Sequence, residues 1–156
     1  MYFSARVTMI REYCPNDWEA VRDIYDLAKP DEMRGVVPTD SIIPLSSSPA
    51  MLTLFEESKI LVFELEGVVA GFGGYRNQTI TYLFVHPEHR RKGVASLLVV
   101  AMLNVLEGEA KLNVAKKNVS AYQLYSRLGF VTETEFEGQY NGYPCEVARM
   151  RHYPLK

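Results

Sequence analysis

Three consecutive cations, Arg90, Arg91 and Lys92, stand directly before Gly93 and an apolar segment with helical periodicity. Cations are disfavoured at a helix N-terminus, because the helix dipole already places positive charge there. The first backbone N–H groups of a helix also lack intrahelical partners. Free amides, a glycine that admits a ligand and flanking cations form a site for an anion such as phosphate. A solvated basic loop is the alternative, but the order strand, Pro87, cations, glycine, helix favours phosphate binding.

Two common phosphate-binding motifs are absent from the sequence. No G-x-x-x-x-G-K-[ST] run occurs, which argues against a P-loop. The glycine-rich run at 71–74 is not G-x-G-x-x-G, and it falls inside an expected strand, where close packing or a β-bulge is its natural role. A nucleotide-binding or adaptor domain is therefore disfavoured.

The surrounding sequence predicts the elements that would position this loop. Strands are expected at 4–13, 59–66, 68–76, 79–85 and 111–115, helices at 15–29, 49–58, from Val94 and at 118–130, and a closing hairpin at 130–138 and 143–153 around residues 140–142. Asn16 is expected to cap the first helix, with Glu19 reaching back. The order β-α-α-β-β-β-α-β-α-β-β predicts an α/β protein whose central mixed sheet carries helices on both faces.

Composition limits the functional classes. Hydrophobic residues make up 47% of the 156 residues and charged residues 23%, as in a soluble globular protein, and one domain over 1–156 is expected. The net charge of -2 gives no basic field for nucleic acid, and no apolar run approaches the ~20 residues that span a membrane. Two cysteines, Cys14 and Cys145, and no signal-peptide pattern indicate a cytoplasmic protein.

Two motifs together resemble the signatures of the GNAT superfamily of acyl-CoA-dependent N-acetyltransferases. The first is Arg90-x-x-Gly93-x-Ala95, after a strand that ends at Val85. The second is Asn118 followed by Ala121-x-x-Leu124-Tyr125-x-x-x-Gly129-Phe130. The resemblance covers about residues 79–131, and residues 1–78 match by the order of elements only.

The resemblance implies that the anion is the pyrophosphate of acetyl-CoA, a co-substrate, and it implies no metal. The strand 79–85 would splay from the strand 111–115, and pantetheine would pair with its exposed edge near Phe84 and Val85. The residues expected to bind acetyl-CoA are Phe84, Val85, Arg90, Arg91, Lys92, Gly93, Val94, Ala95, Ser96 and Asn118. Asn118 is also a good N-cap, and the two roles can coexist.

The implied reaction is direct attack of an amine on the thioester. By analogy with the family, the N–H of Val85 or of its neighbour is the candidate oxyanion donor. Tyr125 falls on the family's general-acid tyrosine, although its spacing also suits core packing. The general base stays unassigned, because the strand 79–85 has no carboxylate. The remaining candidates for the base are His86, His89, Glu64 and Glu66.

The acceptor amine is expected to enter on the side of the N-terminal helices. Residues 12–35 hold seven acidic and three basic side chains, which suits a cationic amine or a solvated helix face. The proline-containing segment 29–48 is expected to be a loop that acts as an acceptor-side lid. Small-molecule and protein amines both stay open, as does a homodimer. A non-catalytic acyl-CoA-binding sensor is the competing function, supported by the missing strand carboxylate.

Overall fold

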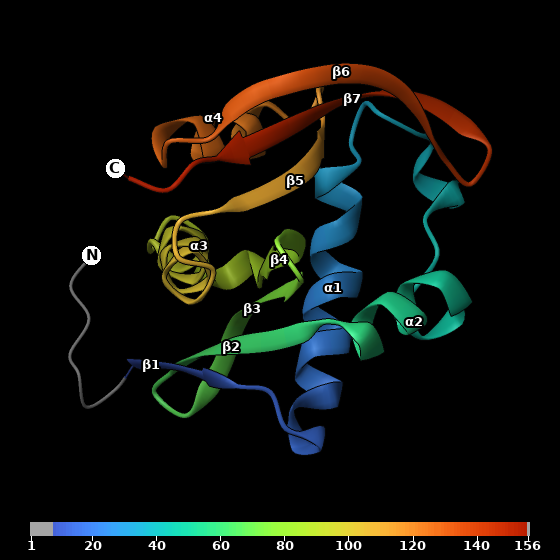
Figure 1. Ribbon diagram of the computed structural model, residues 1–156. Helices are drawn as coiled ribbons and strands as arrows, with labels where there is room; N and C mark the ends of the chain where they lie inside the picture. The colour runs from blue at the N-terminus through green and yellow to red at the C-terminus, as the bar shows by residue number, and fades with distance from the viewer. Residues whose placement is uncertain (1–7, 156) are drawn as a thin grey trace.

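The computed structural model describes residues 8–155 and shows one seven-stranded sheet in the order β1-β2-β3-β4-β5-β7-β6 (Figure 1). The strands are β1 Thr8–Glu12, β2 Lys59–Leu65, β3 Val68–Arg76, β4 Thr79–Val85, β5 Ala110–Ala115, β6 Val131–Tyr140 and β7 Tyr143–His152. The helices are α1 Trp18–Glu32, α2 Pro49–Glu57, α3 Val94–Val105 and α4 Val119–Arg127. The predicted mixed sheet and order of elements are confirmed.

Alternating side chains of the central strands serve two cores. Val62, Phe72 and Phe84 pack with α1 and α2, whereas Phe63 and Ala70 pack with the first half of α3. Because successive strand residues point to opposite faces, α3 covers the face of the sheet opposite to α1 and α2. A third core joins the second half of α3 and α4 to β5 and β7. Of the helices in residues 8–155, none is both long and apolar enough to cross a bilayer.

The glycines of β3 allow α3 to approach the sheet closely. A Cβ on Gly71 would lie 3.0 Å from Cγ1 of Val94, and a Cβ on Gly73 would lie 2.8 Å from Cε of Met102. The expected close-packing role of this glycine run is confirmed, and the β3–β4 register also shifts beside Gly74. The start of α3 is thereby held directly against the sheet.

Strands β4 and β5 are parallel neighbours that separate almost at once. Their only register pair in the described residues is Thr79 with Lys111, next to a bond of 2.9 Å from the N–H of Lys111 to the carbonyl of Gln78. Beyond this pair, β4 remains bonded to β3 on one side and β5 to β7 on the other. The separation that the family resemblance implied is therefore present, and it leaves a gap at the C-terminal ends of both strands.

The first predicted strand and helix differ from the structure at their ends. The described part of the strand is β1, and residues 4–7 of the prediction lie outside the described residues. The expected end of the helix at Lys29 is wrong, because α1 continues through Pro30 to Glu32. Loss of one backbone bond at proline costs about 3 kcal/mol. Packing of Ala28 and Met33 in the protein interior offsets that cost.

The predicted capping of α1 by Asn16 and Glu19 is also wrong. The N-cap residue is Asp17, and its carboxylate makes no cap bond to the helix. Oδ2 of Asp17 instead accepts bonds from Nη1 of Arg11 at 2.8 Å and from the N–H of Cys14 at 2.9 Å. Asp17 is 6% exposed, so this ion pair fixes the entry to the helix.

The segment between α1 and α2 is an anchored connection with short 3-10 helices at Thr39–Ser41 and Leu45–Ser47. Leu45 is fully buried, and its N–H donates to Oδ1 of Asp26 at 2.9 Å. Ser48 accepts a bond from the N–H of Met51, which confirms the predicted start of α2. The role of this segment as a lid stays a prediction.

Asp17→Asn is expected to lower the free energy of unfolding by about 2 kcal/mol at neutral pH. The hydrogen bonds from Arg11 lower the pKa of Asp17 from 3.8 to about 2, and each unit corresponds to about 1.4 kcal/mol. Because the folded-state pKa is lowered, the stabilisation is present above pH 4 and is lost as the pH falls towards 2. Urea unfolding at pH 7 and pH 2.5 measures both effects. Asp23→Asn, an exposed position on the same helix, is the control; equal losses in the two variants would contradict the assignment.

Candidate active site

A cleft of about 550 Å³ follows the gap between β4 and β5. It is lined by β4, the loop at 86–93, the first turn of α3, β5, α4 and the end of α1. Of the predicted site residues, those that line it are Phe84, Val85, Arg90, Arg91, Gly93, Val94, Ala95, Ser96, Asn118 and Tyr125. Lys92 does not line it, and its Nζ lies 3.3 Å from Nδ1 of His89.

The loop before α3 reverses through left-handed backbone conformations. Gly93 has a φ of 80° and Arg91 a φ of 64°. The N–H of Leu97 donates to the carbonyl of Gly93, which leaves the earlier amides of the helix without an i−4 partner. A Cβ on Gly93 would meet no protein atom within 4 Å, so this position faces open space. Glycine is favoured there by the positive φ and not by close packing. The arrangement can bind an anion through backbone amides.

The two arginines of the loop differ in their surroundings. Nη1 of Arg90 donates to Oδ2 of Asp31 at 2.6 Å, and this bond lowers the pKa of the carboxyl. The ion pair links the end of α1 to the basic loop across the cleft. Arg91 is exposed and has no ion-pair partner within residues 8–155, so its guanidinium is available to a ligand. Nothing in the local sequence distinguishes Arg90 from Arg91.

The edge of β4 offers one backbone donor at the gap. The N–H of His86 donates to the carbonyl of Ala70 on β3 at 2.8 Å. Amide directions alternate along a strand, so the N–H of Val85 points away from β3 and into the gap. Phe84 contributes its ring to the cleft, while its carbonyl is turned towards Gly71 on β3.

The α4 motif positions Asn118 and Tyr125 on the opposite wall. Oδ1 of Asn118 accepts a bond of 3.4 Å from the N–H of Ala121, so its predicted capping geometry is present. Tyr125 is 7% exposed, its ring packs edge-on against Phe130, and it also lines the cleft. Burial, and secondarily the charge of Glu32, raises the pKa of the Tyr125 phenol.

Three of the four candidate bases from the sequence do not line the cleft. Glu64 pairs with Arg11 at 2.8 Å, and Glu66 forms a turn with a φ of 52°. Nδ1 of His86 accepts the N–H of Glu88 at 3.0 Å. His89 alone lines the cleft, and burial lowers its pKa, assisted by the positive charge of Lys92.

A cluster at the end of α1 was missed by the sequence reasoning. Glu32 lines both the cleft and an adjoining pocket of about 80 Å³. Its Oε2 lies 3.1 Å from Nζ of Lys29, which in turn lies 5.5–5.8 Å from the ring centres of Tyr25, Phe84 and Tyr140. The signal in the sequence is the spacing of Tyr25, Lys29 and Glu32 along one helical face, and a helix that ends at Lys29 does not include Glu32.

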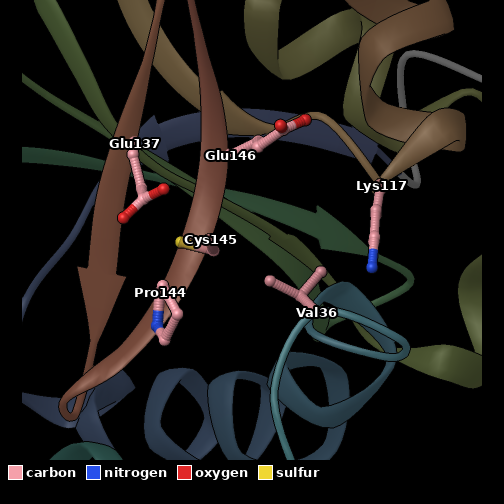
Figure 2. Close-up of a pocket in the computed structure, with 6 residues that line it drawn as sticks. All are labelled: Val36, Lys117, Glu137, Pro144, Cys145 and Glu146. Carbon is pink, nitrogen blue, oxygen red and sulfur yellow. The ribbon is translucent and has the colours of Figure 1, made fainter.

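A separate pocket of about 340 Å³ lies between the α1–α2 segment and the β6–β7 hairpin (Figure 2). Val36 of the segment faces the hairpin, and Lys117 points into the same space. The hairpin residues that line it are Glu137, Pro144, Cys145 and Glu146. Nδ2 of Asn141 in the hairpin turn donates to the carbonyl of Ser41 at 2.5 Å, which joins the two walls. None of the predicted site residues lines this pocket.

Comparison with known proteins agrees with this arrangement. Residues 18–130 match the family described as Acetyltransferase (GNAT) family. The chain belongs to the GNAT family. Over 82 residues, half of the chain, it is 35% identical to the human Cysteine-rich protein 2-binding protein and 34% identical to the mouse protein of that name. The chain spans about a tenth of the length of these curated relatives.

Solved structures of GNAT proteins share the fold. A GCN5-related N-acetyltransferase from Rhodopseudomonas palustris superposes with a TM-score of 0.79 at 16% identity, covering 97% of this chain and 98% of that one. The ribosomal-protein-S18-alanine N-acetyltransferase from Escherichia coli gives 0.75 at 19% identity, covering 96% of each chain. The putative acetyltransferase yncA from Salmonella typhimurium, solved with acetyl-CoA, gives 0.69 at 19% identity, covering 93% and 92%.

Gly93→Val is expected to weaken acetyl-CoA binding by more than about a hundredfold, and Arg91→Ala by about tenfold. Valine is strained at a φ of 80°, and its side chain would occupy the open space beside the amides. Salt screens exposed charges, so only the arginine effect should shrink as salt rises. Calorimetry at two salt concentrations measures both, and thermal unfolding checks the fold. If Gly93→Val binds acetyl-CoA with wild-type affinity, the loop does not bind the pyrophosphate and is a solvated basic surface.

Proposed function

We propose that the protein transfers an acetyl group from acetyl-CoA to a primary amine of a small molecule or protein by direct attack. The observation that carries this proposal is the joint position of three features around one gap. They are the inward N–H of Val85, the unpaired amides at the start of α3 and the phenol of Tyr125. Membership of the GNAT family supports the same reaction.

The proposed cofactor roles follow from these contacts. The amides of residues 93–96 and the guanidinium of Arg91 bind the pyrophosphate, and Arg90 shares its charge with Asp31. The exposed edge of β4 pairs with the pantetheine amides, which supplies the hydrogen bonds that β5 does not make. The N–H of Val85 donates to the thioester oxygen as negative charge develops on it.

Tyr125 is the proposed donor of the proton that the departing thiolate takes. A phenol is a weaker acid than a thiol, and the raised pKa of Tyr125 widens that difference. Proton donation therefore assists the departure of the thiolate without being essential for it. A thiolate formed in the cleft also has solvent as an alternative source of a proton.

The acceptor is proposed to approach from the opposite end of the gap, between the α1–α2 segment and the β6–β7 hairpin. The pocket there holds Glu137 and Glu146 beside Lys117. These carboxylates favour an acceptor that carries positive charge near its reactive amine.

We place the reaction in the cytoplasm, where Cys14 and Cys145 would stay reduced, as both are free in the structure.

Release of free thiol from acetyl-CoA is expected in the presence of a suitable amine and not in its absence. A panel of polyamines, aminoglycosides, amino acids and peptides with free N-termini tests the acceptor class. Cationic acceptors should give the highest kcat/KM, because of the carboxylates at the acceptor end. Tight acetyl-CoA binding with no turnover across the panel would favour the sensor function instead.

Tyr125→Phe is expected to lower kcat by about tenfold to a hundredfold. This loss does not exceed the smallest contribution that is typical of general acid catalysis, which is about a hundredfold. The weak match between the phenol and thiol acidities is the physical reason. The dissociation constant of acetyl-CoA should stay within about twofold of the wild-type value, because the ring remains in place. Measurement of kcat and of acetyl-CoA affinity separates the two effects. Unchanged turnover, with chemistry rate-limiting, would leave Tyr125 with packing alone.

A further inference from the structure

Two buried polar side-chain atoms in residues 8–155 lack a hydrogen-bond partner, and both belong to residues of α1. They are Oη of Tyr25 and Oε2 of Glu32. The ammonium of Lys29 lies 3.1 Å from Oε2, as an ion-pair contact without hydrogen-bond geometry. Buried polar atoms are nearly always bonded in native proteins, so Oε2 of Glu32 can accept a further bond from a bound molecule. Of the two residues only Glu32 lines the cleft, so a primary amine bound there would supply a bond to its Oε2.

The position of Glu32 connects this cluster to the reaction. Five residues, Glu32, Leu83, Phe84, Asn113 and Tyr125, line both the acetyl-CoA cleft and the small adjoining pocket. Glu32 is the only carboxylate among the residues that line both. Glu32 therefore lies at the junction of the acetyl-CoA cleft and the adjoining pocket.

We propose that Glu32 is the general base, with its buried Oε2 accepting the proton that the acceptor nitrogen loses. This assignment rests on the proposed acetyl transfer. Glu32 is the last residue of α1, and it lines the cleft beside Tyr125. Asp31 is a poorer candidate, because Arg90 and Arg34 both pair with it.

The proton balance of the reaction assigns one step to each side chain. The neutral amine attacks the thioester carbon, a C–N bond forms, and the oxygen becomes negative beside the N–H of Val85. The attacking nitrogen is then cationic and acidic, and it gives its proton to Glu32. The C–S bond breaks, and the thiolate takes a proton from Tyr125. Solvent returns the proton from Glu32 to the phenolate, so the products are an amide and free CoA.

The two side chains are coupled by charge. Burial raises the pKa of Tyr125 most, and the negative charge of Glu32 raises it further. When Glu32 takes the proton from the nitrogen, that second contribution disappears. Tyr125 thus becomes a better acid at the stage of the reaction at which a proton is needed.

Lys29 supports this role as a positioning residue. Its side chain is 11% exposed, and the three surrounding aromatic rings hold the ammonium beside Glu32. A fixed cation disfavours a second ammonium nearby, so the acceptor amine binds in its neutral form. Other titratable or charged groups line the two cavities or surround Lys29. They are Tyr25 and Asp31 on α1, Tyr82 on β4, His89, Arg90 and Arg91 in the loop, Tyr125 and Arg127 on α4, and Tyr140 on β6.

Glu32→Gln is expected to lower kcat by about a hundredfold to a thousandfold at pH 7 with the best amine of the panel. Acetyl-CoA affinity should stay within about twofold of wild type, because the glutamine keeps the shape of the cleft. Glu19→Gln, the same change at an exposed position on the same helix, is the matched control and should retain wild-type kcat. Thermal unfolding of both variants verifies the fold.

Chemical rescue separates catalysis from packing. Glu32→Ala vacates the volume of a carboxylate, and added formate is expected to restore kcat at least tenfold in this variant and not in Glu19→Gln. If the wild type is active, either of two results would overturn the role of Glu32 while leaving the proposed function intact. One is a kcat of Glu32→Gln within about threefold of the wild-type value, and the other is a failure of formate to rescue Glu32→Ala. A wild type that acetylates no amine would instead contradict the proposed function, and the assignment of Glu32 with it.

Discussion

The separation of β4 from β5 is the constraint on which the site depends. Two parallel neighbours share one register pair, Thr79 with Lys111, and then diverge. Each strand can tolerate an unpaired edge because its other edge is bonded in a long antiparallel ladder, β4 to β3 and β5 to β7. Separate cores, each with its own helices, support the two sides, and α3 contributes to both. The gap is therefore held open by the rest of the fold.

Features set by nearby residues could be predicted from the sequence. The turn at Gly93, the start of α3 and the cap at Asn118 each depend on a few consecutive residues, and the structure contains all three. The two motifs around them also led to the correct family. The paired arrangement of Arg90 with Asp31 was not predictable in this way, because 59 positions separate the two residues.

The errors near the N-terminus share one physical cause. Pro30 signals a helix end and Asn16 signals a cap, but both signals are local and tertiary contacts can override them. The interior packing of Ala28 and the ion pair of Asp17 with Arg11 decided the outcome. Glu32 reaches the cleft because α1 extends three residues beyond the expected end at Lys29. A helix that ends at Lys29 therefore does not predict a carboxylate in the site.

The single pair between β4 and β5 also gives the sheet a mechanically weak seam. A force that pulls β4 away from β5 meets the bonds around Thr79 and Lys111, whereas the ladders on either side resist with five or more register pairs each. The sheet would rupture at the seam before either ladder yields. A ligand whose amides bridge the two strands would act there as a cross-link, and the rupture force would then report the strength of that bridge.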